Sequence, residues 1–140
     1  MIALDSSVIV AALAWWHGSH DVAAAVVASE LQSRRGLIVA AHALCESYSV
    51  LTRLPEPYRA PCHETAEALI GTFKSTKVVG FPAPEIWNVI DDLASSVLAG
   101  GIIYDAVILR TVEAAGATTL LTFNPRHFER LNPHIRIQEP

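Results

Sequence analysis

The sequence has few charged residues, no long apolar run and only two cysteines, and each of these shortages excludes a class of protein. Only 17% of the 140 residues are charged while 51% are hydrophobic, a balance that excludes intrinsic disorder. The longest uninterrupted apolar run, Val8–Trp16, is too short to span a bilayer. The two cysteines, Cys45 and Cys62, cannot form a disulfide framework. The first residues include Asp5 and no basic side chain, so we expect no secretory signal and a cytoplasmic location.

Basic charge and phosphate-binding loops are also scarce. Neither a GxGxxG nor a GxxxxGK[ST] segment occurs, which argues against a nucleotide-binding enzyme. Ten Lys and Arg residues face fourteen Asp and Glu residues, for a net charge of −4. Proteins that bind nucleic acid usually carry a basic face. If this chain handles RNA or DNA, a metal ion must therefore offset much of the carboxylate repulsion.

Short apolar runs alternate with longer helical segments over 1–140, with no repeat and no linker, so we expect a single domain. Strands are predicted at 2–4, 37–39, 77–79, 118–122 and 135–137. Helices are predicted at 6–15, from 19 or 21 to about 35, at 41–54, 63–73, 84–98 and 105–115, with a turn or short helix at 124–130. This alternation indicates an α/β fold with a mainly parallel central sheet flanked by helices.

Three acidic residues stand in apolar surroundings, where charged side chains are uncommon. Asp5 directly follows the first strand, Glu46 lies within the third helix, and Asp105 heads the helix before the fourth strand. Ligands of parallel α/β sheets bind beyond the carboxyl ends of the strands, so we expect Asp5 and Asn124, which follows the fourth strand, at such a site. Grouped carboxylates repel one another, and a hard cation such as Mg²⁺ or Mn²⁺ most readily holds them together.

Each acid also has a purely structural interpretation. Asp5 and Asp105 could each cap the helix that follows. Glu46 could lie at a solvated helix edge, about a quarter-turn from the apolar residues of its helix. Those apolar residues, at the spacing of a core-facing stripe, are Leu44, Tyr48 and Leu51.

Four segments, taken in order, match the motifs of a known family. They are an apolar strand with Asp-x-Ser at 1–9, Glu46 in the helix after the second strand, an Asp-Ala pair opening an apolar helix at 104–109, and Leu-Leu-Thr followed by Asn and ending in Phe at 120–128. On these segments the chain resembles PIN domains, in the branch of VapC-type toxins of toxin–antitoxin modules. The resemblance covers nearly the whole chain.

The resemblance implies a PIN-like three-layer domain and an endoribonuclease that depends on Mg²⁺ or Mn²⁺. Such an enzyme hydrolyses RNA phosphodiester bonds, forms a homodimer and is neutralised by a cognate VapB-like antitoxin. By the same resemblance, Asp5, Glu46 and Asp105 would hold one or two metal ions, and Asn124 would take a fourth catalytic position that is often Asp in the family.

Further polar residues could take supporting roles. By the same resemblance, Ser7 and Thr122 would support the carboxylate cluster through hydrogen bonds. Apart from the resemblance, Arg126, His127 and Arg130 follow the fourth motif and could contact RNA phosphates, with a solvated helix face as the alternative. His127 stands where many relatives have Asp, and we expect it to be peripheral.

The serious alternative is a non-catalytic PIN-like module that binds RNA or protein. In that case Asn124 marks a degraded metal site, because an amide oxygen ligates a hard cation more weakly than a carboxylate. A phosphatase of the haloacid dehalogenase type would need a second Asp at Ser7. A response-regulator receiver would need a second acid near the first strand and a late lysine, and no lysine follows Lys77.

The high apolar fraction predicts an oligomer or a tight protein partner, because a small monomer has little room to bury so much apolar surface. Trp15 and Trp16 are adjacent at the end of the first helix. We expect one of them to pack in the core and the other to face a partner.

Overall fold

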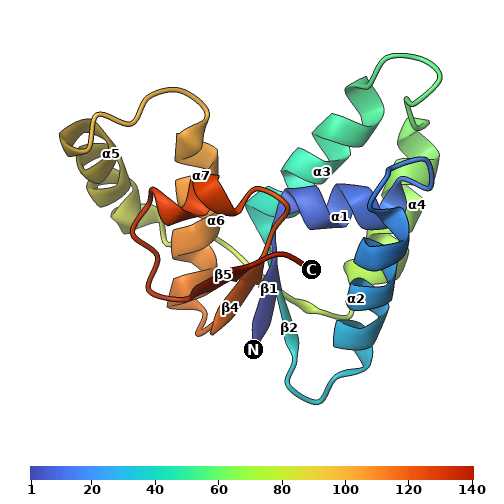
Figure 1. The fold of residues 1–140 in the computed structure, drawn as a ribbon, viewed down its shortest axis with the longest axis horizontal. Coiled ribbons are helices and arrows are strands. Elements are labelled where there is room, and N and C mark those ends of the chain that lie inside the picture. The colour runs from blue at the N-terminus through green and yellow to red at the C-terminus, as the bar shows by residue number, and fades with distance from the viewer.

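The computed structural model describes residues 1–140 and is built around a sheet of five strands (Figure 1). These are β1 (Ile2–Leu4), β2 (Leu37–Ala40), β3 (Lys77–Val79), β4 (Thr119–Leu121) and β5 (Arg136–Gln138). Every neighbouring pair is parallel, and the order across the sheet is β3-β2-β1-β4-β5. The predicted α/β fold with a mainly parallel sheet is confirmed.

Helices cover both sides of this sheet. They are α1 (Ser6–Leu13), α2 (His20–Gln32), α3 (Ala41–Arg53), α4 (Cys62–Phe73), α5 (Ile86–Ser95), α6 (Ile102–Ala114) and α7 (Pro125–Glu129). In Figure 1, α1, α2 and α4 lie on one side of the sheet and α5, α6 and α7 on the other, which makes three layers. None of these helices combines the length and the apolar character needed to cross a membrane.

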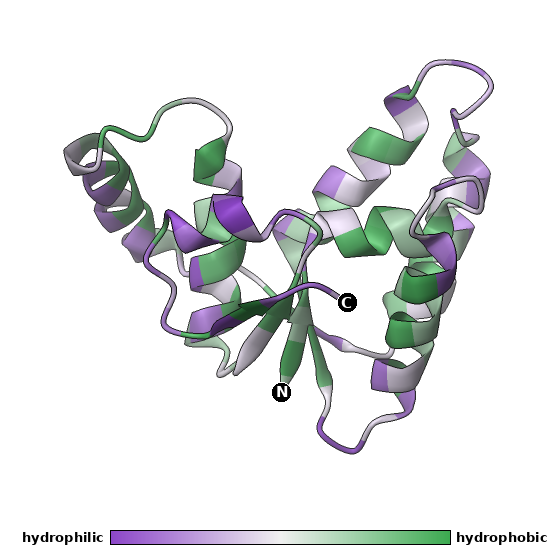
Figure 2. Ribbon diagram, viewed as in Figure 1, coloured by the Kyte–Doolittle hydropathy of each residue, from purple (hydrophilic) through white to green (hydrophobic).

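The core lies between the sheet and the inner faces of the helices. All four residues of β2 are buried, as expected for a parallel strand that is covered on both faces. Figure 2 shows the same pattern at the centre of the sheet, where β1 and β2 carry the hydrophobic colour. The largest fully buried side chains include Phe73, Phe128, Leu4, Ile9 and Ile38.

The strand order reverses at β1. The chain passes from β1 to β2 and β3 on one side, then crosses to β4 and β5 on the other. Such a reversal is a topological switch point, and ligands bind beyond the carboxyl ends of the strands there. The backbone N–H of Asp5, which follows β1, donates to the carbonyl of Leu121, the last residue of β4, at 2.9 Å. The residues after β1 and β4 are therefore held side by side.

Several predicted helix bounds were wrong. The helix predicted from Asp105 begins at Ile102, because Gly101 is its N-cap. Asp105 therefore lies in the first turn of α6, and the prediction that it could cap this helix was wrong. The helix predicted at 84–98 is a 3₁₀ turn at Ala83–Glu85 followed by α5. In the structure α1 and α2 end two and three residues before their predicted ends, because local propensity alone rarely defines the last turn of a helix.

The buried face of α3 differs in part from the predicted one. Leu51 is buried and Leu44 is partly buried against the core, as expected, whereas Tyr48 is 40% exposed. The small residues Ala43 and Ser47 are buried in its place. The Ser47 hydroxyl donates to the Ala43 carbonyl at 2.7 Å, so the buried polar group is satisfied within the helix. Small side chains at these positions let α3 pack closely on its neighbours.

Candidate active site

A polar pocket of about 450 Å³ lies beyond the carboxyl ends of β1 and β4. It brings together side chains from four separate regions of the chain. They are Asp5 and Ser6 after β1, Glu46 on α3, Tyr104 and Asp105 on α6, and Asn124, His127 and Arg130 around α7. We call this hollow the acidic pocket. All four predicted catalytic positions therefore line one pocket, although the longest separation between them in the chain exceeds 100 residues.

Asp5 is buried, with 2% of its surface exposed, and its carboxylate is held by hydroxyl groups. The Ser7 and Thr122 hydroxyls both donate to Oδ2, at 2.6 and 2.8 Å. The Ser6 hydroxyl donates to Oδ1 at 3.3 Å. The Ser7 backbone N–H also donates to Oδ2, at 3.3 Å, so Asp5 is the N-cap of α1 as well as a lining residue of the acidic pocket. The capping interpretation and the site interpretation are thus compatible.

The same two hydroxyls also shape the loop after β4. The Ser7 hydroxyl accepts a hydrogen bond from the Phe123 backbone N–H, and the Thr122 hydroxyl accepts one from the Asn124 backbone N–H, both at 3.0 Å. Asn124 is the N-cap residue of α7, yet its side chain forms no cap hydrogen bond. The backbone of Asn124 is therefore held in place while its side-chain amide is exposed and lines the acidic pocket.

Glu46 is half-buried, and its Oε2 atom is buried without a hydrogen-bond partner. An unpaired buried carboxylate oxygen is costly, because it has lost its hydration and gained no donor in exchange. The solvated helix edge expected as the structural interpretation is therefore wrong for Glu46. Such an oxygen at the wall of a pocket is suited to an incoming cation or donor.

The pKa of the Asp105 carboxyl is raised from 3.8 to about 6, chiefly because the group is buried and also because the negative charge of Asp5 is near. Glu46 adds a smaller repulsion, while His127 opposes these effects. The His127 Nδ1 atom lies 3.2 Å from Asp105 Oδ2. Burial and the neighbouring acids thus both disfavour the charged form of Asp105.

The sequence interpretation named His127 only as a possible RNA contact and expected its replacement of Asp to be peripheral. The structure instead places His127 against Asp105 and in the lining of the acidic pocket. A signal was present, since Asn124, His127 and Arg130 recur at intervals of three residues, the spacing of one helix face.

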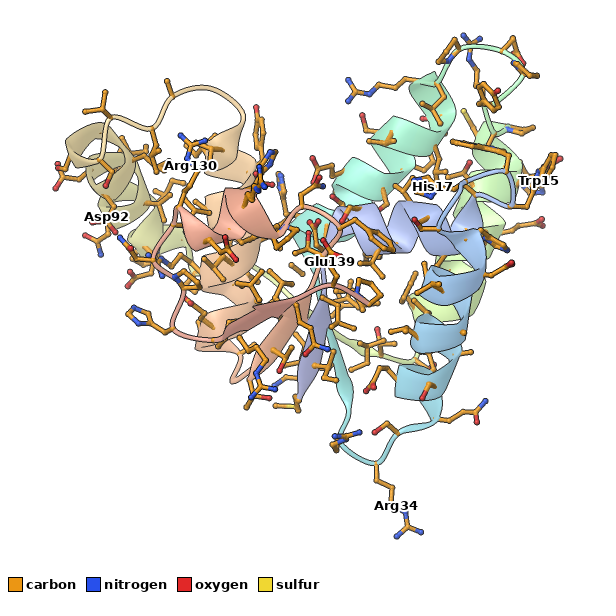
Figure 3. The ribbon with its side chains drawn as sticks, in the orientation of Figure 1. Trp15, His17, Arg34, Asp92, Arg130 and Glu139 are labelled. Atoms are coloured by element: carbon orange, nitrogen blue, oxygen red, sulfur yellow. The ribbon has the colours of Figure 1, made fainter.

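The two arginines predicted to contact RNA differ in position. Arg130 lines the acidic pocket, and Arg126 is exposed but is not among its lining residues. None of the four ion pairs in the chain involves Arg130. Figure 3 shows the Arg130 side chain among α5, α6 and α7, and it also borders a second hollow between α5 and α6. The guanidinium is therefore free to bind an anion.

The donors of the acidic pocket suit a hard divalent cation. No three His, Cys, Asp or Glu side chains of the chain already stand together as the ligands of one metal ion. The pocket nevertheless collects three carboxylates and the amide of Asn124, and oxygen donors of this kind are what Mg²⁺ and Mn²⁺ take. A cation would relieve both the unpartnered oxygen of Glu46 and the repulsion felt by Asp105. The residues present therefore fit such an ion.

The chain resembles known proteins in both sequence and fold. A family model for the PIN domain matches residues 2–132. The curated protein Ribonuclease VapC40 of Mycobacterium tuberculosis is 38% identical over 141 aligned residues, which cover 98% of each chain. Two solved structures share the fold at low sequence identity. VapC20 of M. tuberculosis, described as a toxin that cleaves the sarcin-ricin loop, has a TM-score of 0.74 at 16% identity over 92% of this chain and 94% of that one. VapBC2 of Rickettsia felis, bound to a DNA fragment from its promoter, has a TM-score of 0.70 at 17% identity over 100% and 99%.

Proposed function

The chain belongs to the PIN-domain family, and from that premise we propose that it is a VapC-type endoribonuclease, the toxin of a toxin–antitoxin pair. One observation carries the proposal. Asp5, Glu46 and Asp105, which lie far apart in the sequence, line a single polar pocket at the switch point of the sheet. The similarity to a named ribonuclease spans almost the whole of both chains, so it includes every segment that contributes to this pocket.

We infer that Asp5, Glu46 and Asp105 hold Mg²⁺ or Mn²⁺, with Asn124 as a neutral fourth donor. A divalent cation bound there supplies an activated water and stabilises negative charge on the phosphate. The contribution of the protein is to hold the oxygen donors in place. Ser7 and Thr122 support Asp5 by fixing its Oδ2 atom.

The substrate is RNA, and its phosphates reach the acidic pocket past Arg130. A guanidinium without a carboxylate partner binds phosphate oxygens through paired N–H donors. Arg126, which is exposed on α7 just before Arg130, is the second candidate for a phosphate contact. Proteins recognise RNA in sequence-specific ways chiefly at single-stranded loops and ends, and an open pocket suits such a substrate.

A VapB-like antitoxin and a second copy of the chain are the protein partners that we propose, acting in the cytoplasm. The Rickettsia felis neighbour is described as VapBC2, which supports an antitoxin partner. Apolar side chains on the surface support a further interface of the chain. Those exposed by more than half include Trp15, Ile70, Trp87 and Val97. Trp15 is 81% exposed and projects from the molecule, whereas Trp16 packs on Tyr58 with ring centroids 4.8 Å apart (Figure 3).

The second candidate function is a non-catalytic PIN-like module that binds RNA or protein. Two observations favour it. The carboxylates of the acidic pocket do not form a ready-made ligand group, and Asn124 replaces a carboxylate that is common in the family. Metal-dependent cleavage separates the two functions.

The deciding experiment incubates the purified, antitoxin-free chain with total cellular RNA in Mg²⁺, in Mn²⁺ and in a chelator. Asp105→Asn is the test variant, and Asp92→Asn is the matched control, because Asp92 is exposed on α5 and does not line the acidic pocket. We expect discrete fragments with either metal, lost in the chelator and in Asp105→Asn and retained in Asp92→Asn. A folded chain that retains RNA without cutting it in either metal would instead establish the binding module.

A further inference from the structure

Two aromatic rings stack at the edge of the acidic pocket. The rings of His42 and Tyr104 have centroids 5.4 Å apart and planes that differ by 13°. His42 lies in the first turn of α3 and Tyr104 in the first turn of α6. The stacked pair therefore joins the two helices that carry Glu46 and Asp105.

The pair lies beside the groups to which we assign catalysis. Tyr104 lines the acidic pocket and directly precedes Asp105. His42 is four residues before Glu46, so the two share one face of α3. Any RNA whose phosphate enters the acidic pocket brings a base close to these rings.

Tyr104 is 53% exposed although one of its faces is against His42. The exposed surface therefore lies on the rim and on the opposite face of the ring. An aromatic face that is left in water beside a pocket is apolar surface that a planar ligand can cover. The His42 ring lies nearly parallel to the Tyr104 ring. It therefore holds the tyrosine ring in an orientation in which a planar base can stack on the opposite face.

Resting on the ribonuclease function proposed above, we propose that Tyr104, backed by His42, is a stacking platform for an unpaired RNA base next to the phosphate in the acidic pocket. Bases of single-stranded RNA stack on aromatic side chains whatever their identity, because every base has a π-face. His42 acts through Tyr104 as a positioning residue, since it holds the plane of the tyrosine ring.

Charge makes such a platform useful to this chain. The net charge is −4 and three carboxylates line the acidic pocket, so the protein attracts the RNA backbone poorly before a cation binds. Stacking depends on dispersion and apolar burial rather than on net charge. A base stacked on Tyr104 would thus add binding affinity that the phosphate contacts alone do not supply.

The test measures binding rather than cleavage, with every protein carrying Asp5→Asn to prevent cutting. The probe is a single-stranded RNA of six adenosines, with one central base replaced by fluorescent 2-aminopurine. A second probe is a hexamer of abasic ribonucleotides, which has the same phosphates without bases. The test variant is Tyr104→Leu, and Tyr104→Phe keeps the ring. Trp87→Leu is the matched control, because Trp87 is 73% exposed on α5 and is not a lining residue of the acidic pocket.

We expect Tyr104→Leu to weaken binding of the adenosine probe by about 5- to 100-fold and to abolish quenching of 2-aminopurine, since stacking of one base contributes ~1–3 kcal/mol. Tyr104→Phe and Trp87→Leu should bind and quench as the parent does, and His42→Ala should give an intermediate loss. On the abasic probe, Tyr104→Leu and the parent should bind equally. Circular dichroism of Tyr104→Leu checks that the variant is folded.

Other outcomes would overturn the proposal. Equal losses on both probes would mean that Tyr104 only packs α3 against α6. Unchanged RNA binding, with loss of binding to a co-expressed antitoxin, would place Tyr104 in a protein interface instead. If the chain with Asp5 intact cuts RNA and Tyr104→Leu binds unchanged, the platform alone fails. If the chain with Asp5 intact cuts no RNA but the Asp5→Asn parent shows ring-dependent quenching, the ribonuclease function fails and the platform remains.

Discussion

The Thr122 hydroxyl donates a hydrogen bond of 2.8 Å to Asp5 across 117 positions of the sequence. Both residues are buried, with 0% and 2% of their surfaces exposed. Thr122 follows β4 and Asp5 follows β1, so this one contact joins the carboxyl ends of two adjacent parallel strands. This hydrogen bond orients the Asp5 carboxylate in the acidic pocket. The hydroxyl that donates it is held at the end of β4, the strand that precedes Asn124.

Thr122→Val tests this contact, because valine keeps the shape of the side chain and removes the hydroxyl. We expect the free energy of unfolding to fall by about 1–3 kcal/mol, since a buried carboxylate oxygen loses a donor. The Asn124 backbone N–H loses its acceptor in the same variant. Urea titrations measure the change, and Thr122→Ser should restore most of it. In an Asp5→Asn background the loss should be smaller, and an equal loss there would show that the contact with Asp5 carries little of the energy.

We expect that replacing Asp105 stabilises the metal-free protein. Its folded pKa of about 6 lies above its unfolded value of 3.8, so folding favours the protonated carboxyl. Stability is therefore lost as pH rises between these two values and stays lower above them. We expect Asp105→Asn to be more stable than the parent at about pH 7.5 in chelator, by on the order of 1 kcal/mol after allowing for solvent screening. The difference should vanish near pH 4, and a variant that is less stable at both pH values would contradict the prediction.

Divalent cations should reverse the order of stability of the parent and Asp105→Asn. Because an ion that binds only the folded state adds RT ln(1 + [L]/Kd) to stability, Mg²⁺ or Mn²⁺ should raise the unfolding temperature of the parent. Asp105→Asn and Glu46→Gln should respond less, because each removes one charged donor from the acidic pocket. Asp92→Asn is the control and should respond as the parent does. Differential scanning calorimetry with and without metal measures the shifts, and equal shifts in all variants would place the cation elsewhere.

Asn124→Asp should tighten metal binding. A fourth carboxylate adds negative charge to the donor set, and ligand charge is a main determinant of affinity for hard cations. We expect half-maximal cleavage at about a tenfold lower Mg²⁺ concentration, which corresponds to ~1.4 kcal/mol. In chelator the same variant should be less stable than the parent, because the added charge repels the other acids. Cleavage rates across a Mg²⁺ series provide the measurement, and an unchanged midpoint would exclude Asn124 from the metal site.

Arg126 and Arg130 form a matched pair, because Arg126 lies on α7 and Arg130 is the residue that caps its end. Arg130 lines the acidic pocket and Arg126 does not, although both are exposed. We expect Arg130→Ala to raise KM for RNA several-fold and to lower the salt dependence of binding by about 0.7 in the log–log slope, the share of one phosphate contact on a single strand. Arg126→Ala should change both quantities less. Binding measured over a range of salt concentrations tests this, and equal effects would indicate a diffuse basic surface.

Much of the fold and part of the site could be predicted from local patterns. The strand at 77–79 has the bounds that were predicted, and β2 is one residue longer than predicted, because short apolar runs between helices and turns are local signals. Asp5 and Asn124 could be placed near the carboxyl ends of parallel strands, since Asp5 directly follows β1 and Asn124 lies shortly after β4. The motifs identified the family, and a match of the PIN-domain model to residues 2–132 confirms it.

The sequence by itself determined the alternation of strands and helices and the identity of the acidic residues, because these depend on each residue and its near neighbours. Only the tertiary structure decided which side chains meet. It brought His127 against Asp105, stacked His42 on Tyr104 and buried one oxygen of Glu46. These contacts depend on the order of strands across the sheet and on the packing of α3, α6 and α7, which join residues that no local pattern relates. The chemical groups of the pocket follow from single residues of the sequence, whereas their arrangement follows from long-range packing.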